Sequence, residues 1–114
     1  MAYTNNLPIN YSVSGDIVSA NVDLLKCDIP NASSVSVVRV SVNSAIAATG
    51  GEVIEVTNAA SGAGTDTISV TFSAGEYFAY ATGDMSLTDY AWIRSGDTVN
   101  TLADINTTIR YQPS

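Results

Sequence analysis

Hydrophobic and polar residues alternate along most of this chain, and a two-residue period predicts half-buried β-strands. In residues 18–24, valine, alanine and leucine take every second position, with serine, asparagine and aspartate between them. Residues 67–72 repeat the pattern, and residues 76–82, 89–94 and 107–111 are rich in the tyrosine, isoleucine, tryptophan and threonine that strands favour. No helical period of comparable strength occurs, so the pattern predicts an all-β protein.

Turn-forming residues interrupt these segments at seven places along the chain. Most contain glycine or proline, which supply the backbone conformations that tight turns need. Seven breaks predict about eight strands, at a spacing typical of β-sandwiches and barrels. We therefore predict one all-β domain over residues 1–114, an antiparallel β-sandwich of about eight strands that is jelly-roll-like or immunoglobulin-like. The Cys–Trp–Cys pattern of immunoglobulin domains is missing, which favours the jelly roll.

The segment SVSVVRVSVN, residues 34–43, breaks the simple alternation. Its valines are odd-numbered up to Val37 and even-numbered from Val38 onwards. A strand whose inward face changes in this way contains a bulge, passes from one sheet to the other, or is covered on both sides. The third arrangement would require contact with another chain. An aspartate in place of Val38 or Val40 is expected to unfold the domain.

The charge of the chain limits its partners. The 114 residues carry a net charge of −7, and the four cations lie far apart in sequence, at Lys26, Arg39, Arg94 and Arg110. Binding to phosphate backbones or anionic lipids requires clustered cations, so we expect no nucleic acid and no membrane among the partners. The sequence also lacks a long apolar run and the features of a signal peptide, and we expect a soluble protein.

Few side chains suited to catalysis are present. Without histidine, the Ser-His-Asp and Cys-His triads and imidazole metal sites are excluded. The single cysteine, Cys27, lies among leucine and isoleucine and is expected to be a core or half-buried residue. Glu52 and Glu55 would face opposite sides of a strand, which makes them poor partners for glycoside hydrolysis. The aspartates of residues 84–104 lack the spacing of a calcium-binding loop. We expect no enzyme, no cofactor and no bound metal.

Aromatic residues gather in one stretch. Tyr77, Phe78, Tyr80, Tyr90 and Trp92 fall within sixteen residues. Phe78 and Tyr80 would share one face of a strand, as would Tyr90 and Trp92, so two neighbouring strands could form one aromatic patch by cross-strand pairing. Such a patch would anchor a partner protein or stack against sugar rings if exposed, and would belong to the core if buried.

Both ends of the chain have the composition of extended segments. The N-terminal residues 1–10 are polar with an early proline, and the C-terminal residues 111–114 follow a predicted strand and contain another proline. We predict an N-terminal arm over 1–10 and a C-terminal tail over 111–114. Both are expected to lie along another surface.

Several sequence features together resemble one functional class. They are the start MAYTNNLPINYS, the valine-, serine- and threonine-rich strands SVSVVRVSVN and DTISVTF, the low charged fraction, the lack of histidine and the end TTIRYQPS. In these the chain resembles, as a class, the small all-β decoration or cement proteins of tailed bacteriophage capsids. The resemblance implies a virion protein on the capsid exterior, assembled in the host cytoplasm, that bridges neighbouring subunits of the major capsid protein lattice. It could also bind itself as a homo-oligomer.

Under this hypothesis the partner-binding residues come from the arms, the valine segment and the aromatic patch. We assign this role to Tyr3, Leu7, Ile9, Val38, Val40, Tyr80, Tyr90, Trp92, Arg110 and Tyr111.

Two other classes of function compete with the structural one. A carbohydrate-binding β-sandwich module would use Tyr77, Tyr80, Tyr90 and Trp92 as a platform for sugar rings. An enzyme would have to work with carboxylates alone.

Overall fold

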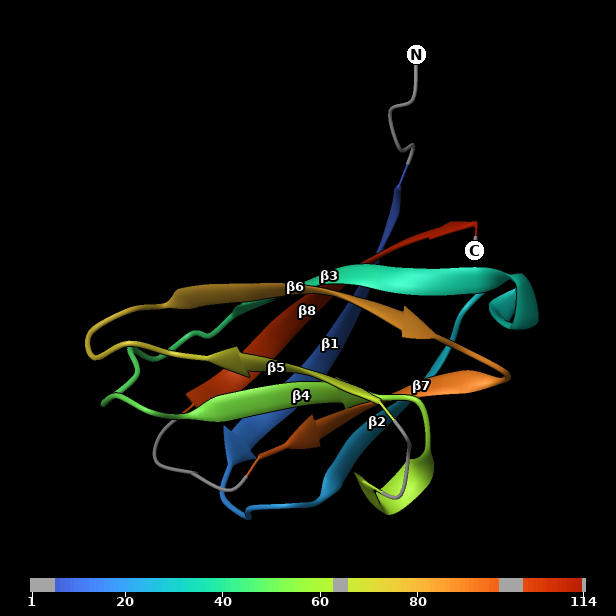
Figure 1. The fold of residues 1–114 in the computed structure, drawn as a ribbon. Coiled ribbons are helices and arrows are strands. Elements are labelled where there is room, and N and C mark those ends of the chain that lie inside the picture. Colours follow the sequence, from blue (N-terminus) through green and yellow to red (C-terminus); the bar gives the residue numbers. More distant parts are fainter. Residues whose placement is uncertain (1–5, 63–65, 97–101, 114) are drawn as a thin grey trace.

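The computed structural model describes residues 6–62, 66–96 and 102–113 (Figure 1). These residues form eight strands and two short 3₁₀ turns, η1 at Ala32–Ser34 and η2 at Ala60–Gly62. The strands are β1 (Leu7–Ile17), β2 (Asp23–Asp28), β3 (Val35–Asn43), β4 (Val53–Thr57), β5 (Thr67–Thr71), β6 (Phe78–Ser86), β7 (Tyr90–Ser95) and β8 (Leu102–Pro113). The prediction of an all-β sandwich is confirmed.

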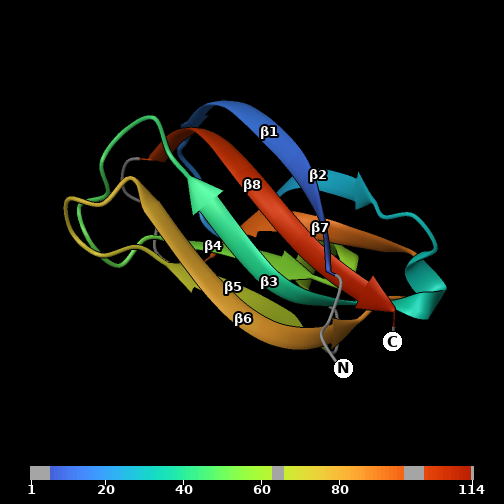
Figure 2. The ribbon, with the colours of Figure 1, turned by 90° about the horizontal axis from the view of Figure 1, so that it is seen from above.

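The strands form two antiparallel sheets that pack face to face. Sheet A has the order β1-β8-β3-β6 and sheet B the order β2-β7-β4-β5. The first strand pairs with the last, the second with the seventh, the third with the sixth and the fourth with the fifth. A long two-stranded ribbon rolled into a sandwich has this pairing, which is the jelly roll. Strand order therefore selects the jelly roll over the immunoglobulin plan. Figure 2 shows the four strands of sheet A side by side in front of sheet B.

A β-bulge explains the change of face in the valine segment. On β3, Val37 pairs with Tyr111 of β8 while Arg39 pairs with the preceding residue, Arg110, so Val38 has no partner on β8. This extra residue reverses the alternation. The inward valines are accordingly odd-numbered before the bulge and even-numbered after it, and each is at most 6 % exposed: Val35, Val37, Val40 and Val42. Of the three arrangements that the sequence allowed, the structure has the bulge.

The hydrophobic core fills the space between the sheets. Its largest fully buried apolar side chains come from β3, β4, β6, β7 and β8 and from the connections, and they are Phe72, Ile29, Ile54, Met85, Ile93, Ile105, Ile109, Val37, Val40, Val42 and Val56. Cys27 is also fully buried, as predicted. At the edge where β1 meets β2, the Tyr11 hydroxyl donates a hydrogen bond of 2.7 Å to the Asp28 carbonyl and joins the two sheets.

Residues 18–22 form a connection and not part of a strand, contrary to the prediction. β1 ends at Ile17 and the chain must then cross from sheet A to sheet B, where β2 begins at Asp23. Val18 is 78 % exposed, and Asn21 has a left-handed backbone with φ of 57°. The alternation of apolar and polar residues in this segment does not correspond to a buried face, because residues 18–22 are all exposed.

The strands reach further toward both ends of the chain than predicted. Residues 7–10 of the expected arm belong to β1, and residues 111–113 of the expected tail belong to β8. They are paired with each other, since Leu7 faces Tyr111 and Pro8 faces Arg110. This part of both segments therefore lies within sheet A. Residues 1–5 and 114 are outside the described residues.

Candidate functional site

The aromatic side chains of the predicted patch divide between the two sheets. Phe78 and Tyr80 lie on β6 in sheet A, whereas Tyr90 and Trp92 lie on β7 in sheet B. The prediction of one patch across neighbouring strands is wrong, because the turn between β6 and β7 carries the chain from one sheet to the other. Each pair remains in contact within itself, with ring centroids 6.2 Å apart in the first and 5.9 Å apart in the second.

The Tyr90–Trp92 pair is partly covered by a lysine. Lys26 faces Trp92 across the β2–β7 ladder, and its Nζ atom lies 3.9 Å from the centroid of the Tyr90 ring. A cation in this position is attracted by the ring's π-electrons. The ammonium group thus occupies one face of Tyr90, which limits that face as a platform for a sugar.

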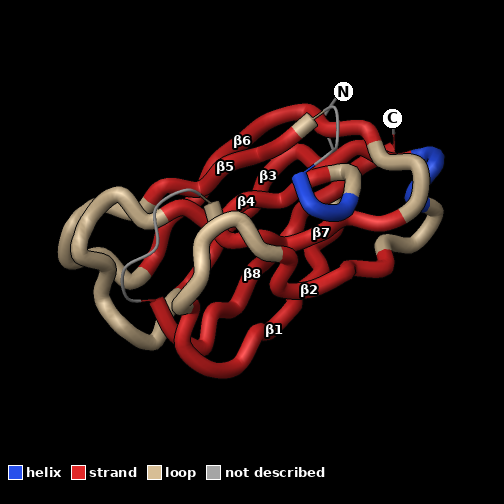
Figure 3. The backbone as a smooth tube through the Cα atoms, turned by 90° about the horizontal axis from the view of Figure 1, so that it is seen from below, coloured by secondary structure: helices blue, strands red, loops and turns tan. Residues whose placement is uncertain are grey.

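The loop containing η2 lies over the outer face of sheet B (Figure 3). It is held there by Asp23, whose carboxylate accepts hydrogen bonds from the Ser61 backbone N–H at 3.0 and 3.1 Å. Under this loop Arg94 is only 5 % exposed. The outer face of sheet B is therefore occupied by the protein itself over this region.

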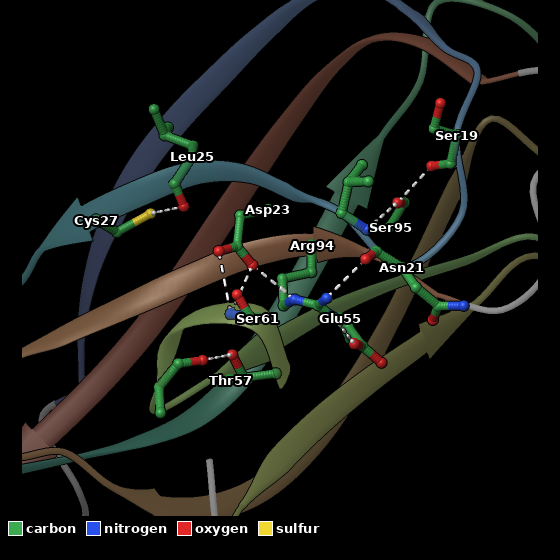
Figure 4. Close-up of polar contacts among 12 residues, drawn as sticks. Ser19, Asn21, Asp23, Leu25, Cys27, Glu55, Thr57, Ser61, Arg94 and Ser95 are labelled. Atoms are coloured by element: carbon green, nitrogen blue, oxygen red, sulfur yellow. Dashed lines mark hydrogen bonds and ion pairs between the residues drawn. The ribbon is translucent and has the colours of Figure 1, made fainter. Parts of the chain in front are cut away.

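Arg94 of β7 joins β2, β4 and the connection that precedes β2 (Figure 4). Its guanidinium donates to Asp23 at 2.6 Å, to Glu55 at 3.0 Å and to the carbonyl of Asn21 at 2.8 Å. Burial by itself lowers the pKa of Arg94, but the hydrogen bonds and charges of the two carboxylates outweigh it and raise the pKa above its ordinary value. All its contacts are internal, so this cluster stabilises the fold.

The outer face of sheet A carries a different set of side chains. We call it the sheet A face and define it by Arg39, Ser41, Phe78, Tyr80, Thr82, Thr108 and Arg110. These residues alternate with buried ones along β3 and β8 and with half-buried alanines along β6. Figure 2 looks onto this face, and no described strand or turn lies over it. Sheet A therefore presents an outer surface that the described chain leaves open.

Two arginines are neighbours on the sheet A face. Arg39 and Arg110 are paired directly across the β3–β8 ladder. The Arg39 guanidinium carbon lies 4.4 Å from the centroid of the Tyr80 ring, and its buried Nε atom has no hydrogen-bond partner among the described residues. Arg110 donates from Nη1 to the side-chain oxygen of Asn6 at 3.2 Å.

Aromatic rings form one border of this face. Tyr80 is 58 % exposed and Phe78 is 42 % exposed. Binding a partner over such rings removes a large apolar area from water. Tyrosine and arginine are also enriched among the residues that dominate binding energy in protein interfaces. The arrangement is thus chemically suited to protein binding.

The structure separates the predicted partner-binding residues into three groups. Leu7, Tyr80 and Tyr90 are exposed, while Ile9, Val38, Trp92 and Arg110 are half-buried. Val40 and Tyr111 are buried in the core, so their assignment to a partner surface is wrong. After the bulge the even-numbered residues of β3 point inward, and Val40 is one of them. Tyr111 points inward because side chains alternate along β8. Tyr3 lies outside the described residues.

The sequence analysis did not assign Arg39 to any surface site, and it included Phe78 in the aromatic patch but not among the partner-binding residues. Arg39 lies inside a valine-rich strand. In a regular strand its side chain would point to the same side as that of Val37, into the core. Its charge was the available signal, because an arginine is rarely buried without a partner.

Three further titratable side chains, Cys27, Glu52 and Glu55, are held in contacts within the protein. Burial raises the pKa of the Cys27 thiol to about 12, which keeps it protonated and unreactive at neutral pH. Glu52 is 1 % exposed, and its carboxylate accepts hydrogen bonds from the backbone N–H groups of Thr49 and Gly50 at 2.9 and 2.7 Å. Glu55 faces Arg94, so the two glutamates do not meet, as their spacing predicted.

The described part of the chain has no group of three or more cysteine, aspartate and glutamate side chains placed to hold a metal ion. Within the same residues, no helix has the length and apolar character required to span a bilayer.

A shallow depression of about 290 Å³ lies at one end of the sandwich, beside Tyr90. Asp28, Asn31 and Asp89 contribute polar groups to its lining. Carboxylate and amide groups beside an aromatic ring can bind hydroxyl groups of a small polar ligand.

Comparison with known proteins adds no relative. A scan against protein-family models finds no match to this chain, and a search among curated proteins finds none either.

Proposed function

We propose that this protein is a virion structural protein that binds to the exterior of a bacteriophage capsid and stabilises it by bridging neighbouring subunits of the shell. The observation that supports the proposal most directly is the sheet A face, an open surface with exposed Tyr80 and Phe78 beside two arginines. Tyrosine and arginine are the residue types that anchor protein interfaces.

The geometry of the fold agrees with this role. The outer face of sheet A is open over β3, β6 and β8, so a partner can contact several strands at once. A capsid repeats the same surface many times, so each copy of a decorating protein needs only a modest interface. A copy that contacts two shell subunits at once gains further affinity through its second contact.

The first experiment is sedimentation of native source material through a density gradient, followed by peptide mass spectrometry of each fraction. The proposal requires this chain to travel with particles of megadalton size at a fixed ratio to a major shell protein. Recovery only in the slowly sedimenting fractions, as a small species, would refute the proposal.

A matched pair of variants then tests the surface. Tyr80→Ser removes an exposed ring from sheet A, and Tyr90→Ser removes an exposed ring from sheet B. Purified variants are added to particles stripped of the protein, and bound protein is measured after sedimentation. We expect Tyr80→Ser to bind at least tenfold more weakly, about 1.4 kcal/mol, and Tyr90→Ser to bind as the unmodified protein. Weaker binding of Tyr90→Ser than of Tyr80→Ser would place the contact on sheet B.

The depression beside Tyr90 favours a second candidate, a carbohydrate-binding module. In this case the ligand would lie against Asp28, Asn31 and Asp89. Trp92 contacts Tyr90, so its fluorescence should respond to a bound glycan. A glycan that shifts the Trp92 emission and loses this effect in Asn31→Ala would support the candidate, and an emission that no glycan changes would speak against it.

A further inference from the structure

We propose that the sheet A face receives an acidic segment of its protein partner, and that Arg39 and Arg110 bind the carboxylates of that segment. This inference rests on the proposed function and specifies the chemistry of the partner surface. It starts from the way in which the strand brings the two arginines together.

The bulge at Val38 determines the direction of Arg39. In an unbroken strand Arg39 would point to the same side as Val37, which is fully buried. The extra residue turns Arg39 to the outer face, directly opposite Arg110. Bulges commonly redirect one side chain in this way and occur near functional sites.

The two arginines are neighbours of like charge. Residues paired directly across antiparallel strands have Cβ atoms about 5 Å apart, and like charges in such pairs are unfavourable. In the described residues the ion pairs within the protein belong to Arg94. Asp84, the acidic residue of β6 nearest in sequence to Thr82, forms no ion pair with either arginine of this face. A carboxylate from outside would relieve the repulsion.

The concentration of charge contrasts with the rest of the molecule. The chain has eleven acidic residues and four cations, with a net charge of −7. Half of these cations therefore lie together on one face of sheet A. A positive spot on an acidic protein favours a local acidic segment as its partner.

Arg39 is held in a conformation suited to an anion. Its guanidinium lies over the Tyr80 ring, which restrains the side chain and covers one of its flat sides. The terminal N–H groups of a guanidinium lie in its plane and match the two oxygens of a carboxylate. The Nε atom is buried without a hydrogen-bond partner among the described residues, so a carboxylate from outside would bind the terminal Nη groups.

The surroundings of the arginines favour a protein carboxylate over a phosphate polymer. The rings of Phe78 and Tyr80 lie 6.2 Å apart and are 42 % and 58 % exposed, so a partner gains apolar contact as well as charge neutralisation. A nucleic acid would offer many phosphates to only two cations and would be repelled by the net charge of −7.

The test uses an oligoglutamate peptide as probe and isotope-labelled full chain observed by NMR. We expect shifts of the amide signals of Ser41, Thr82 and Thr108 that saturate at millimolar peptide and weaken with added salt. An oligoglutamine peptide of the same length and inorganic phosphate serve as comparison ligands. Equal shifts with oligoglutamine, stronger shifts with phosphate, or no shifts with oligoglutamate overturn the inference.

Single-charge variants localise the effect. Arg39→Gln and Arg110→Gln should each weaken the affinity for oligoglutamate by about threefold, the scale of one exposed charge pair. Lys26→Gln is the matched control, because it removes one positive charge from the outer face of sheet B. Equal weakening by Lys26→Gln would show a general charge effect and overturn the inference. The circular dichroism spectrum of each variant shows whether it is folded. If one arginine variant does not fold, the other is compared with Lys26→Gln.

Particle binding separates this inference from the proposed function. If the unmodified protein binds stripped particles and Arg39→Gln and Arg110→Gln bind equally well, the inference is wrong and the proposed function stands. If the unmodified protein does not travel with particles, the proposed function is wrong, and the peptide titration still decides whether the two arginines bind carboxylates.

Discussion

Two neighbouring valines of β3 should respond very differently to the same substitution. Val40 is fully buried between the sheets, whereas Val38 is the extra residue of the bulge and is half-buried outside the core cluster. The sequence alone predicted that an aspartate at either position unfolds the domain. The structure restricts this effect to Val40.

The expected magnitudes follow from burial. Replacing Val40 by Asp removes about 1.5–3 kcal/mol of side-chain burial. It also places a carboxylate in the apolar core between the sheets, which costs several kcal/mol more. The total is comparable with the whole stability of a domain, about 5–15 kcal/mol. At Val38 the loss is about 1 kcal/mol, because only part of the side chain is buried and the carboxylate remains in water.

Urea unfolding followed by circular dichroism measures both effects. Val38→Asp should keep a cooperative transition with a slightly lower midpoint, whereas Val40→Asp should have no folded baseline. Val38→Ala and Val40→Ala provide measurable values if the aspartate variant of Val40 does not fold, with losses of less than about 1 and of about 2 kcal/mol. Equal losses at the two positions would refute the bulge assignment, and with it the outward direction of Arg39.

Two further predictions concern buried polar groups. Arg94→Met should lower the free energy of unfolding by about 2–4 kcal/mol, because the carboxylates of Asp23 and Glu55 lose their common cation; a loss below about 0.5 kcal/mol in urea unfolding would contradict the structural role. Burial raises the pKa of Cys27 from 9.0 to about 12, so the unfolded chain releases this proton first and stability is lost as the pH rises from 9 toward 12. Between pH 9 and 10 the urea midpoint should fall more steeply in the unmodified protein than in Cys27→Ala, and parallel curves would contradict it. The window stops at pH 10 because burial also raises the pKa of Tyr11, from 10.0 to about 12, which adds its own loss above pH 10.

The local pattern of the sequence determined the type of structure. Alternation in residues 67–72 and the turn residues between the strands correctly predicted an eight-stranded sandwich. These features act over a few residues, since side chains of a strand alternate between a wet and a buried face. The valine segment also limited its own geometry to three arrangements, one of which is the bulge that the structure has.

The tertiary structure decided which strands are neighbours, and this decided the surfaces. β6 and β7 follow each other in sequence but lie in different sheets, so Tyr80 and Trp92 cannot form one patch. Arg39 and Arg110 are 71 positions apart in the chain and become direct neighbours through the β3–β8 ladder. Pairing between distant strands depends on how two complete hydrophobic faces fit together, and no short segment of sequence contains that information.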